Sequence, residues 1–315
     1  ISVRTMAEAK AEAQSFADAP FDLMSGPLFR IGLISEDEDT HVMVLTLHAS
    51  IADEASVDIA LNELAVLYSA YSDGFATPLR SPKLQHADLV RWQDGWMQGA
   101  VLDGQISWWR DRLDGAPAAL ALPIDHNRPP VQTHAGARHV WFIAQKASQT
   151  ELGTAFAILL HRFSGQSDIS IGLELPHRAL DGAAGLLGPL VNLAVLRLTV
   201  ETGMTISDLK RDYVAALADV HDHGATPFDL VVDALQPERR LNQSPLLQVL
   251  LRLHSDEGSL PSFNRAKALP LPDDLVRSEY DLTLTLRATG AGIEAGIDYA
   301  ADLFEPATIA RMAEA

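Results

Sequence analysis

The sequence predicts an α+β fold divided between two lobes, and three observations support this. The chain has 315 residues, 47% of them hydrophobic, which is enough to bury one large core or two linked cores. Helical and strand-like patterns follow one another without the strict alternation of a doubly wound sheet. The proline-rich stretch Ala116–Pro130 cannot form a continuous helix and is typical of a linker. We therefore expect one lobe at 1–118 and another at 119–315.

The first lobe begins with an alanine- and glutamate-rich helical pattern at Val3–Phe16. A turn with two prolines then leads into a strand, and the apolar run Val42–Leu47 predicts another strand. Two later helical runs, Leu84–Gln98 and Ile106–Leu113, carry tryptophans that are most simply core residues. Between them and the second strand, apolar residues at helical spacing predict a further helix: Val57, Leu61, Leu64, Ala65 and Tyr68.

The second lobe is predicted from apolar, strand-like runs and two helical patterns. Its longest apolar stretch, Gly185–Val200, is interrupted by Pro189, Asn192 and Arg197, so it does not predict a membrane span. The helices are expected at Thr205–His221 and Pro227–Leu235. The strands are expected at Ile169–Leu175, Leu190–Val200, Leu246–Leu253 and Tyr280–Leu286.

Charge and cysteine content narrow the function. The net charge of -18, from 42 acidic and 24 basic residues, argues against nucleic-acid and anionic-membrane partners, because both need a cationic surface. It fits a basic partner, or simply keeps the protein in solution. The absence of cysteine excludes disulfides and thiolate metal sites and favours a cytoplasmic location. His221 and His223 diverge on a helix, so we expect neither a metal nor a cofactor.

One junction between a strand and a helix stands out. After the apolar run comes Leu47-His48-Ala49-Ser50-Ile51-Ala52-Asp53-Glu54, followed by the helical pattern. This segment closely resembles the HHxxxDG signature of the condensation-domain superfamily of nonribosomal peptide synthetases. In that family the second histidine lies beside the amine that attacks a carrier-bound thioester. Here Ala49 takes the place of that histidine, and Glu54 takes the place of the closing glycine.

The resemblance extends along the whole chain, with the motifs in the family's order. Some family features are lost: Leu193 replaces a threonine, and the Gln-Asp pair of HQDxPF is absent after His223. The matching segments are Pro20–Leu23 with Gly26–Arg30, Leu84–Asp88 with Trp92-Gln93, Trp109–Leu113, Leu122–Asp125, Gly188–Asn192, Gln236–Arg239, Ser244–Val249, Tyr280–Leu284 and Tyr299–Phe304.

The resemblance implies a two-lobed, V-shaped fold like that of chloramphenicol acetyltransferase, with a tunnel between the lobes and a further segment ahead of residue 1. His48 is expected to support the motif loop, and Asp53 is expected to hold it through a buried ion pair, because an unpaired buried carboxylate is costly. Glu54, as a solvated carboxylate, is poorly matched to act as a base toward an amine. Asn192 is a candidate tunnel-lining residue for a phosphopantetheine arm, or else a partner for strand backbone.

Ala49 decides the leading hypothesis. Aminolysis of a thioester is helped by a proton acceptor or hydrogen-bond partner within about 3 Å of the amine, and a methyl group can be neither. We therefore expect no catalytic residue and an inactive, condensation-like docking platform. Its resemblance is to the X domain of glycopeptide-antibiotic synthetases, which recruits cytochrome P-450 oxygenases to the carrier-bound peptide. The expected partners are a tailoring oxygenase, a haem monooxygenase, and a peptidyl carrier protein.

Two alternatives remain open at this point. Precise positioning can supply about 7 kcal/mol or more of rate acceleration, so an active condensation domain can form a peptide bond between carrier-bound substrates without the usual histidine. Ala49 can also be a laboratory substitution made to trap a substrate complex. The change at Glu54 in the same loop favours natural divergence, because an engineered knockout normally alters only the histidine.

Overall fold

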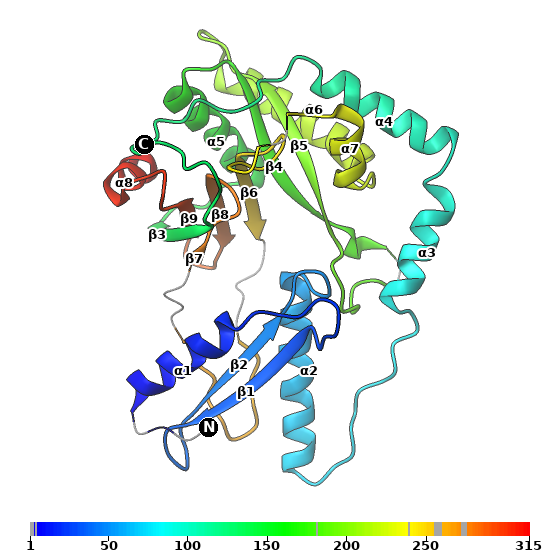
Figure 1. Ribbon diagram of the computed structural model, residues 1–315, viewed down its shortest axis with the longest axis vertical. Helices are drawn as coiled ribbons and strands as arrows, with labels where there is room; N and C mark the ends of the chain where they lie inside the picture. The colour runs from blue at the N-terminus through cyan, green and yellow to red at the C-terminus, as the bar shows by residue number, and fades with distance from the viewer. Residues whose placement is uncertain (1–2, 4, 181, 239, 255–259, 272–275) are drawn as a thin grey trace. The chain divides into compact units, whose positions relative to one another are not determined.

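The computed structural model describes residues 3, 5–180, 182–238, 240–254, 260–271 and 276–315, and these residues form two compact units (Figure 1). Unit 1 consists of Ile1–Trp92, His177–Leu190 and Ser259–Asp274, and unit 2 consists of Gln93–Pro176, Val191–Gly258 and Leu275–Ala315. Each unit therefore contains more than one segment of the chain.

The division expected at residues 118 and 119 differs from these units, which part after Trp92. The reason is that the helices before the proline-rich stretch are bonded to unit 2. Gln93 donates from Nε2 to the carbonyl oxygen of Ala225 at 3.0 Å, and Trp109 donates from Nε1 to the carbonyl oxygen of His223 at 3.2 Å. The stretch Ala116–Pro130 consequently lies wholly within unit 2.

Unit 1 is built on an antiparallel hairpin of β1 (Phe29–Ser35) and β2 (His41–Leu47), in which Phe29 faces Leu47. The helix α1 (Met6–Asp18) packs on this hairpin, as Figure 1 shows. Its small side chains allow close approach, and the shared core consists of Ala9, Ala13, Ile34 and Val42. The helix α2 (Glu54–Ser72) follows β2, and α3 (His86–Trp96) leads into unit 2.

Unit 2 is built on a seven-stranded sheet in the order β5-β4-β6-β8-β9-β3-β7. The pairs β4–β6 and β6–β8 are parallel, and the other neighbours are antiparallel. A mixed sheet with helices in no strict alternation confirms the predicted α+β class. The strands are β3 (Ala135–Ile143), β4 (Asp168–Pro176), β5 (Val191–Thr199), β6 (Val249–His254), β7 (Val276–Arg277), β8 (Leu282–Ala288) and β9 (Ile293–Ala300).

The two faces of this sheet differ in polarity. In β4, Ile169, Ile171, Leu173 and Leu175 belong to the buried core, and they alternate with residues such as Ser170 on the other face. Helices α5 and α6 pack on β4 and β5, and α8 packs on β3. The helices of unit 2 beyond α3 are α4 (Ala100–Leu113), α5 (Gln149–Ser164), α6 (Ile206–His223), α7 (Phe228–Leu235) and α8 (Pro306–Glu314), and the 3₁₀ turn η1 (His177–Ala179) belongs to unit 1.

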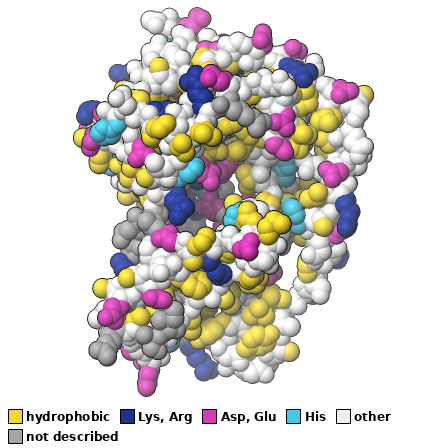
Figure 2. Space-filling model, in the orientation of Figure 1, with side chains coloured by type: hydrophobic (Ala, Val, Ile, Leu, Met, Phe, Trp, Pro, Cys, Tyr) yellow, Lys and Arg dark blue, Asp and Glu magenta, His cyan; other side chains and the backbone are white. Residues whose placement is uncertain are grey.

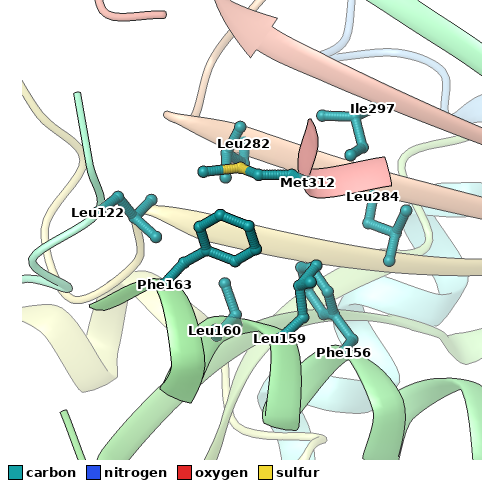
Figure 3. A pocket seen from close by; sticks show the side chains of 9 residues that line it. All are labelled: Leu122, Phe156, Leu159, Leu160, Phe163, Leu282, Leu284, Ile297 and Met312. Atoms are coloured by element: carbon teal, nitrogen blue, oxygen red, sulfur yellow. The ribbon is translucent and has the colours of Figure 1, made fainter. Parts of the chain in front are cut away.

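The apolar core of unit 2 is tightly filled. Side chains of α5, α8 and the sheet surround a gap of about 10 Å³, and Figure 3 shows Phe163 of α5 pointing toward Met312 of α8. A gap of this size with only apolar walls is a packing defect and not a ligand site. Within the ranges that the structure describes, none of the helices combines the length and hydropathy needed to cross a bilayer.

Candidate active site

The motif loop joins β2 to α2 within unit 1. A turn brings Ile51 N within 3.0 Å of the carbonyl oxygen of His48, and Asp53 is the N-cap of α2. Asp53 Oδ1 accepts from Ser56 N at 2.9 Å, while Asp53 N donates to Ser56 Oγ at 3.4 Å. This reciprocal capping fixes the point at which the loop ends and the helix begins.

Asp53 forms a buried ion pair with Arg178 of η1. Arg178 Nη2 lies 2.5 Å from Asp53 Oδ1, and the two side chains are only 12% and 8% exposed. The second carboxylate oxygen accepts from Leu190 N at 3.0 Å. Burial raises the pKa of Asp53, but hydrogen bonds from Ser56, Arg178 and Leu190 outweigh it, so the net pKa is lowered. The carboxyl group therefore stays ionised near neutral pH.

Ser56 and Gly188 complete the network. Ser56 is fully buried, and its hydroxyl lies 2.7 Å from Asp53 Oδ1 and 2.9 Å from Gly188 O. The same hydroxyl accepts from Gly188 N at 3.0 Å. A side chain at Gly188 has no room, because a Cβ there meets the ring of His86 at 2.5 Å. These bonds thus tie the motif loop and α2 to Arg178, Gly188 and Leu190.

His48 is held by its neighbours in the loop. Ser50 N donates to His48 Nδ1 at 3.1 Å, and Ser50 Oγ lies 2.8 Å from the same nitrogen. The bond from the amide N–H assigns the proton of the neutral imidazole to Nε2. The ring of Phe21 meets the imidazole edge-on, with 5.9 Å between centroids. The contacts of His48 thus lie within the motif loop and with Phe21.

Ala49 and Glu54 are both exposed. The methyl group of Ala49 offers no donor or acceptor at the place where the family motif carries its second histidine. Glu54 occupies the first turn of α2, where a carboxylate interacts favourably with the helix dipole. Glu54 thus has a structural reason to be acidic that is independent of chemistry.

Asn192, the candidate tunnel residue, lies in unit 2 and is bonded to backbone. Its Nδ2 donates to the carbonyl oxygens of Gly224 at 2.8 Å and Thr226 at 2.6 Å, and its Oδ1 accepts from Phe228 N at 3.1 Å. The side chain therefore ties β5 to the loop between α6 and α7.

His223, at the position of the degenerate HQD segment, also has a packing role. Its Nδ1 lies 2.8 Å from Gln105 Oε1, and its ring stacks on Trp108 with 3.9 Å between centroids and 9° between planes. Thr226 Oγ donates to the same oxygen of Gln105 at 3.2 Å. Across the described residues, histidine and acidic side chains do not gather into groups of three or more that could ligate a metal ion.

Sequence reasoning did not identify Arg178 or Ser56. Ser56 carries a readable signal, because serine three residues after an aspartate N-cap completes a capping arrangement. Arg178 carries none, because it lies 125 residues from Asp53 and no local pattern links the two.

Comparison with known proteins agrees with this architecture. The family model described as "Condensation domain" matches residues 1–315. The chain belongs to the condensation-domain family. Among curated proteins, it is similar to two components of the linear gramicidin synthase of Brevibacillus parabrevis, with 35% identity over 99% of its length to one and 36% identity over 98% of its length to the other. It spans 4% and 6% of the lengths of those two proteins.

Two of the solved structures that resemble this chain contain the X-domain from teicoplanin biosynthesis. The whole chain matches 74% of a chain in the complex of the X-domain and OxyB from teicoplanin biosynthesis, with a TM-score of 0.89 and 25% identity. It matches 75% of the isolated teicoplanin X-domain with a TM-score of 0.88 and 24% identity. It also matches 76% of the condensation domain of the Monacolin K polyketide synthase MokA, with a TM-score of 0.82 and 18% identity. The predicted family, fold and likeness to X domains are confirmed.

The prediction that this condensation domain is not an enzyme is wrong. Its curated relatives over nearly the whole chain are subunits of linear gramicidin synthase, and their identity to this chain exceeds that of the teicoplanin X-domain. The error came from giving one missing imidazole more weight than the framework around it. Asp53, Arg178, Ser56 and Gly188 keep that framework closed and ordered.

Proposed function

We propose that this condensation domain catalyses peptide-bond formation between carrier-bound substrates in a nonribosomal peptide synthetase, without the usual second histidine. Membership of the family over the whole chain and identity to components of a peptide synthase support the proposal. The carrier proteins present their substrates as thioesters on phosphopantetheine arms. In the reaction the acceptor amine attacks the thioester carbonyl carbon, the C–S bond breaks, and the donor arm leaves as a thiolate. The proton lost by nitrogen passes to that thiolate or to water.

Rigid positioning is the catalytic contribution that the loop retains. The ion pair of Asp53 with Arg178 and the buried hydroxyl of Ser56 fix the loop that the family uses to place the acceptor amine. Holding two reactants at about 3–3.5 Å in the right orientation can lower a barrier by about 7 kcal/mol or more. General base catalysis, which Ala49 cannot provide, contributes a smaller factor of roughly 10² to 10⁴. We therefore expect the domain to be active but slower than one that carries the histidine.

The experiment compares the native chain with Ala49→His, using donor and acceptor carrier proteins loaded with aminoacyl thioesters. We expect the native domain to form dipeptidyl thioester faster than the same carriers alone. Ala49→His is expected to raise the rate by roughly tenfold or more, up to the range of general base catalysis. Ala55→His, in the first turn of α2, is the matched control and is expected to leave the rate unchanged. If the native domain gives no product above the carriers alone, the proposal fails.

A second candidate function is docking of a tailoring oxygenase of the cytochrome P-450 type. The likeness to an X-domain that was solved in complex with OxyB supports it. The net charge of -18 suits a partner with exposed arginines. On the face in Figure 2, acidic side chains are scattered over the surface and do not gather in one patch, so many weak contacts are expected in place of one strong ion pair.

Calorimetry against oxygenases encoded beside the synthetase tests this docking. Binding is expected to be weak and to fall as salt rises, because screening weakens charge pairs at the rim of an interface. A folded oxygenase from the same pathway that shows no heat of binding at low salt contradicts docking. That result leaves the condensation activity unaffected, so the two functions are tested separately.

A further inference from the structure

A cavity of about 520 Å³ lies within unit 2, on the Ser170 face of β4 and beside the C-terminal ends of α4 and α7. Its floor is formed by Ser170 of β4 and Val195 of β5. One wall is the turn after α4, Leu113–Ala118, and the other comprises residues of the segment that follows α7, including Gln243 and Leu246. Volumes of roughly 300–1,000 Å³ are typical of small-molecule sites.

The walls of this cavity are held by the partly buried side chain of Arg197 and the buried side chain of Gln248. Arg197 Nη1 donates to the carbonyl oxygens of Arg112 at 3.0 Å and Asp114 at 2.6 Å, while its other nitrogens bind Asp168. Gln248, only 5% exposed, donates to the carbonyl oxygens of Ala118 at 3.3 Å and Ser244 at 3.5 Å. One amide group thus bridges both walls, and the cavity keeps its shape without an occupant.

The floor of the cavity holds an unsatisfied polar group. Ser170 Oγ is buried and has no hydrogen-bond partner among the described residues. A buried hydroxyl without a partner is costly, and native structures retain few of them. The walls around it are mainly apolar, with Leu113, Val195 and Leu246. These features fit an apolar molecule that brings one hydrogen-bonding group to Ser170.

The lining carries two arginines and two acidic side chains, and their pairing leaves one arginine for an anionic end of that molecule. Arg240 is paired with Glu238 at 2.8 Å, and Asp114 lies near Arg197, whose pKa it helps to raise. Arg110 donates from Nε to the carbonyl oxygen of Ala234 at 3.4 Å, and no acidic partner for it is found among the described residues. Arg110 is therefore the cation in this lining that can bind a carboxylate.

We propose that this cavity binds a small apolar carboxylate, with Ser170 and Arg110 as its polar contacts. The site does not depend on the condensation activity. Ser170 precedes Pro176, the last residue of β4, by six positions, or roughly 20 Å along an extended strand. The cavity is thus far along the strand from the point where the chain enters the Arg178 segment of unit 1.

Calorimetric titration with octanoate and with the neutral octanamide tests the proposal. Octanoate is expected to bind with one site per chain and at least about tenfold more tightly than octanamide, as a charged hydrogen bond requires. Arg110→Gln is expected to remove this preference, while Arg91→Gln on the exposed surface of α3 retains it. Ser170→Ala, which removes only the hydroxyl group, is expected to weaken octanoate binding roughly three- to tenfold.

Two variants that fill the cavity locate the binding. Ala118→Phe and Ala234→Phe each place a ring in the space and are expected to abolish octanoate binding, whereas Ala100→Phe, at an exposed position, retains it. Circular dichroism and thermal melting show which variants are folded. Absence of octanoate binding to the native chain overturns the proposal. So does binding that survives in a folded filling variant or that Ser170→Ala and Arg110→Gln leave unchanged.

Discussion

Arg178 Nη2 lies 2.5 Å from Asp53 Oδ1 although 125 residues separate them in the chain. Both side chains are almost fully buried, and each makes further hydrogen bonds to Ser56 and to the backbone around Gly188. Removing one partner leaves a buried charge without its counterpart. This lowers the stability of the fold more than replacing both partners with apolar residues does. The stability of unit 1 therefore depends on a contact between two distant segments.

Truncating either partner is expected to be strongly destabilising. Arg178→Met and Asp53→Ala should each lower the free energy of unfolding by about 3–5 kcal/mol. The double variant should lose less than the sum of the two, because it leaves no uncompensated charge. Urea unfolding of the four proteins checks this coupling. Additive losses would show that the pair does not interact energetically.

The same carboxylate predicts how stability changes with pH. The pKa of Asp53 is lowered in the folded protein, so the unfolded chain binds its proton first as pH falls. The contribution of Asp53 to the free energy of unfolding is present at pH values above its unfolded-state pKa of about 3.9. It disappears as the pH falls through the lower pKa of the folded state. Asp53→Asn should flatten the stability profile in that acidic window, as measured by urea unfolding at a series of pH values. Glu63→Gln, at an exposed position of α2, controls for the loss of one charge.

Asn192 should matter for folding more than for catalysis. Asn192→Ala removes three hydrogen bonds to the backbone of the loop between α6 and α7. At about 1 kcal/mol each, the expected loss is about 2–4 kcal/mol. Thermal and urea unfolding measure it, and Asn62→Ala, whose side chain bonds to Asp58 on the exposed face of α2, is the matched control. Equal small losses in both variants would contradict the role assigned to Asn192.

The filled core of unit 2 predicts a large cost for truncation. Leu160 is 2% exposed and lies among the side chains of Figure 3. Leu160→Ala should destabilise the protein by about 2–5 kcal/mol, because the surrounding side chains cannot collapse fully into the space. Val66→Ala, at a position 43% exposed, should cost about 0.5 kcal/mol or less. Chemical unfolding of both variants gives the comparison.

The strands that sequence reasoning found in unit 2 carry large apolar side chains at every second position. β4, β6 and β8 show this with isoleucine, leucine or valine along one face, and they lie inside the sheet, where these side chains are buried. β3 and β9 were not predicted. Their alternating positions include small and polar residues, such as Ala137 and His139 of β3 and Ala295 of β9, so the pattern is weaker.

The candidate site was predicted only as far as its local sequence allowed. His48, Ala49 and Asp53 stand together in the chain, and their motif could be read directly. Arg178 reaches Asp53 only because the fold returns the segment His177–Leu190 to unit 1, and spacing along the chain does not encode that return. The lobe boundary expected at residues 118 and 119 differs from the division of the units for the same reason, because contacts between distant segments are not visible in the sequence. Bonds such as that from Trp109 to His223 attach the helices after Trp92 to unit 2.

The discontinuous make-up of unit 1 has a consequence for its synthesis. A ribosome releases residue 53 long before residue 178, so the nascent chain carries the Asp53 carboxylate without the guanidinium that neutralises it. During that interval α2 lacks its long-range anchor, and unit 2 is being translated between the two halves of the pair. Unit 1 therefore matures late, and a ribosome stalled before Arg178 emerges holds an unfinished N-terminal segment that chaperones must shield.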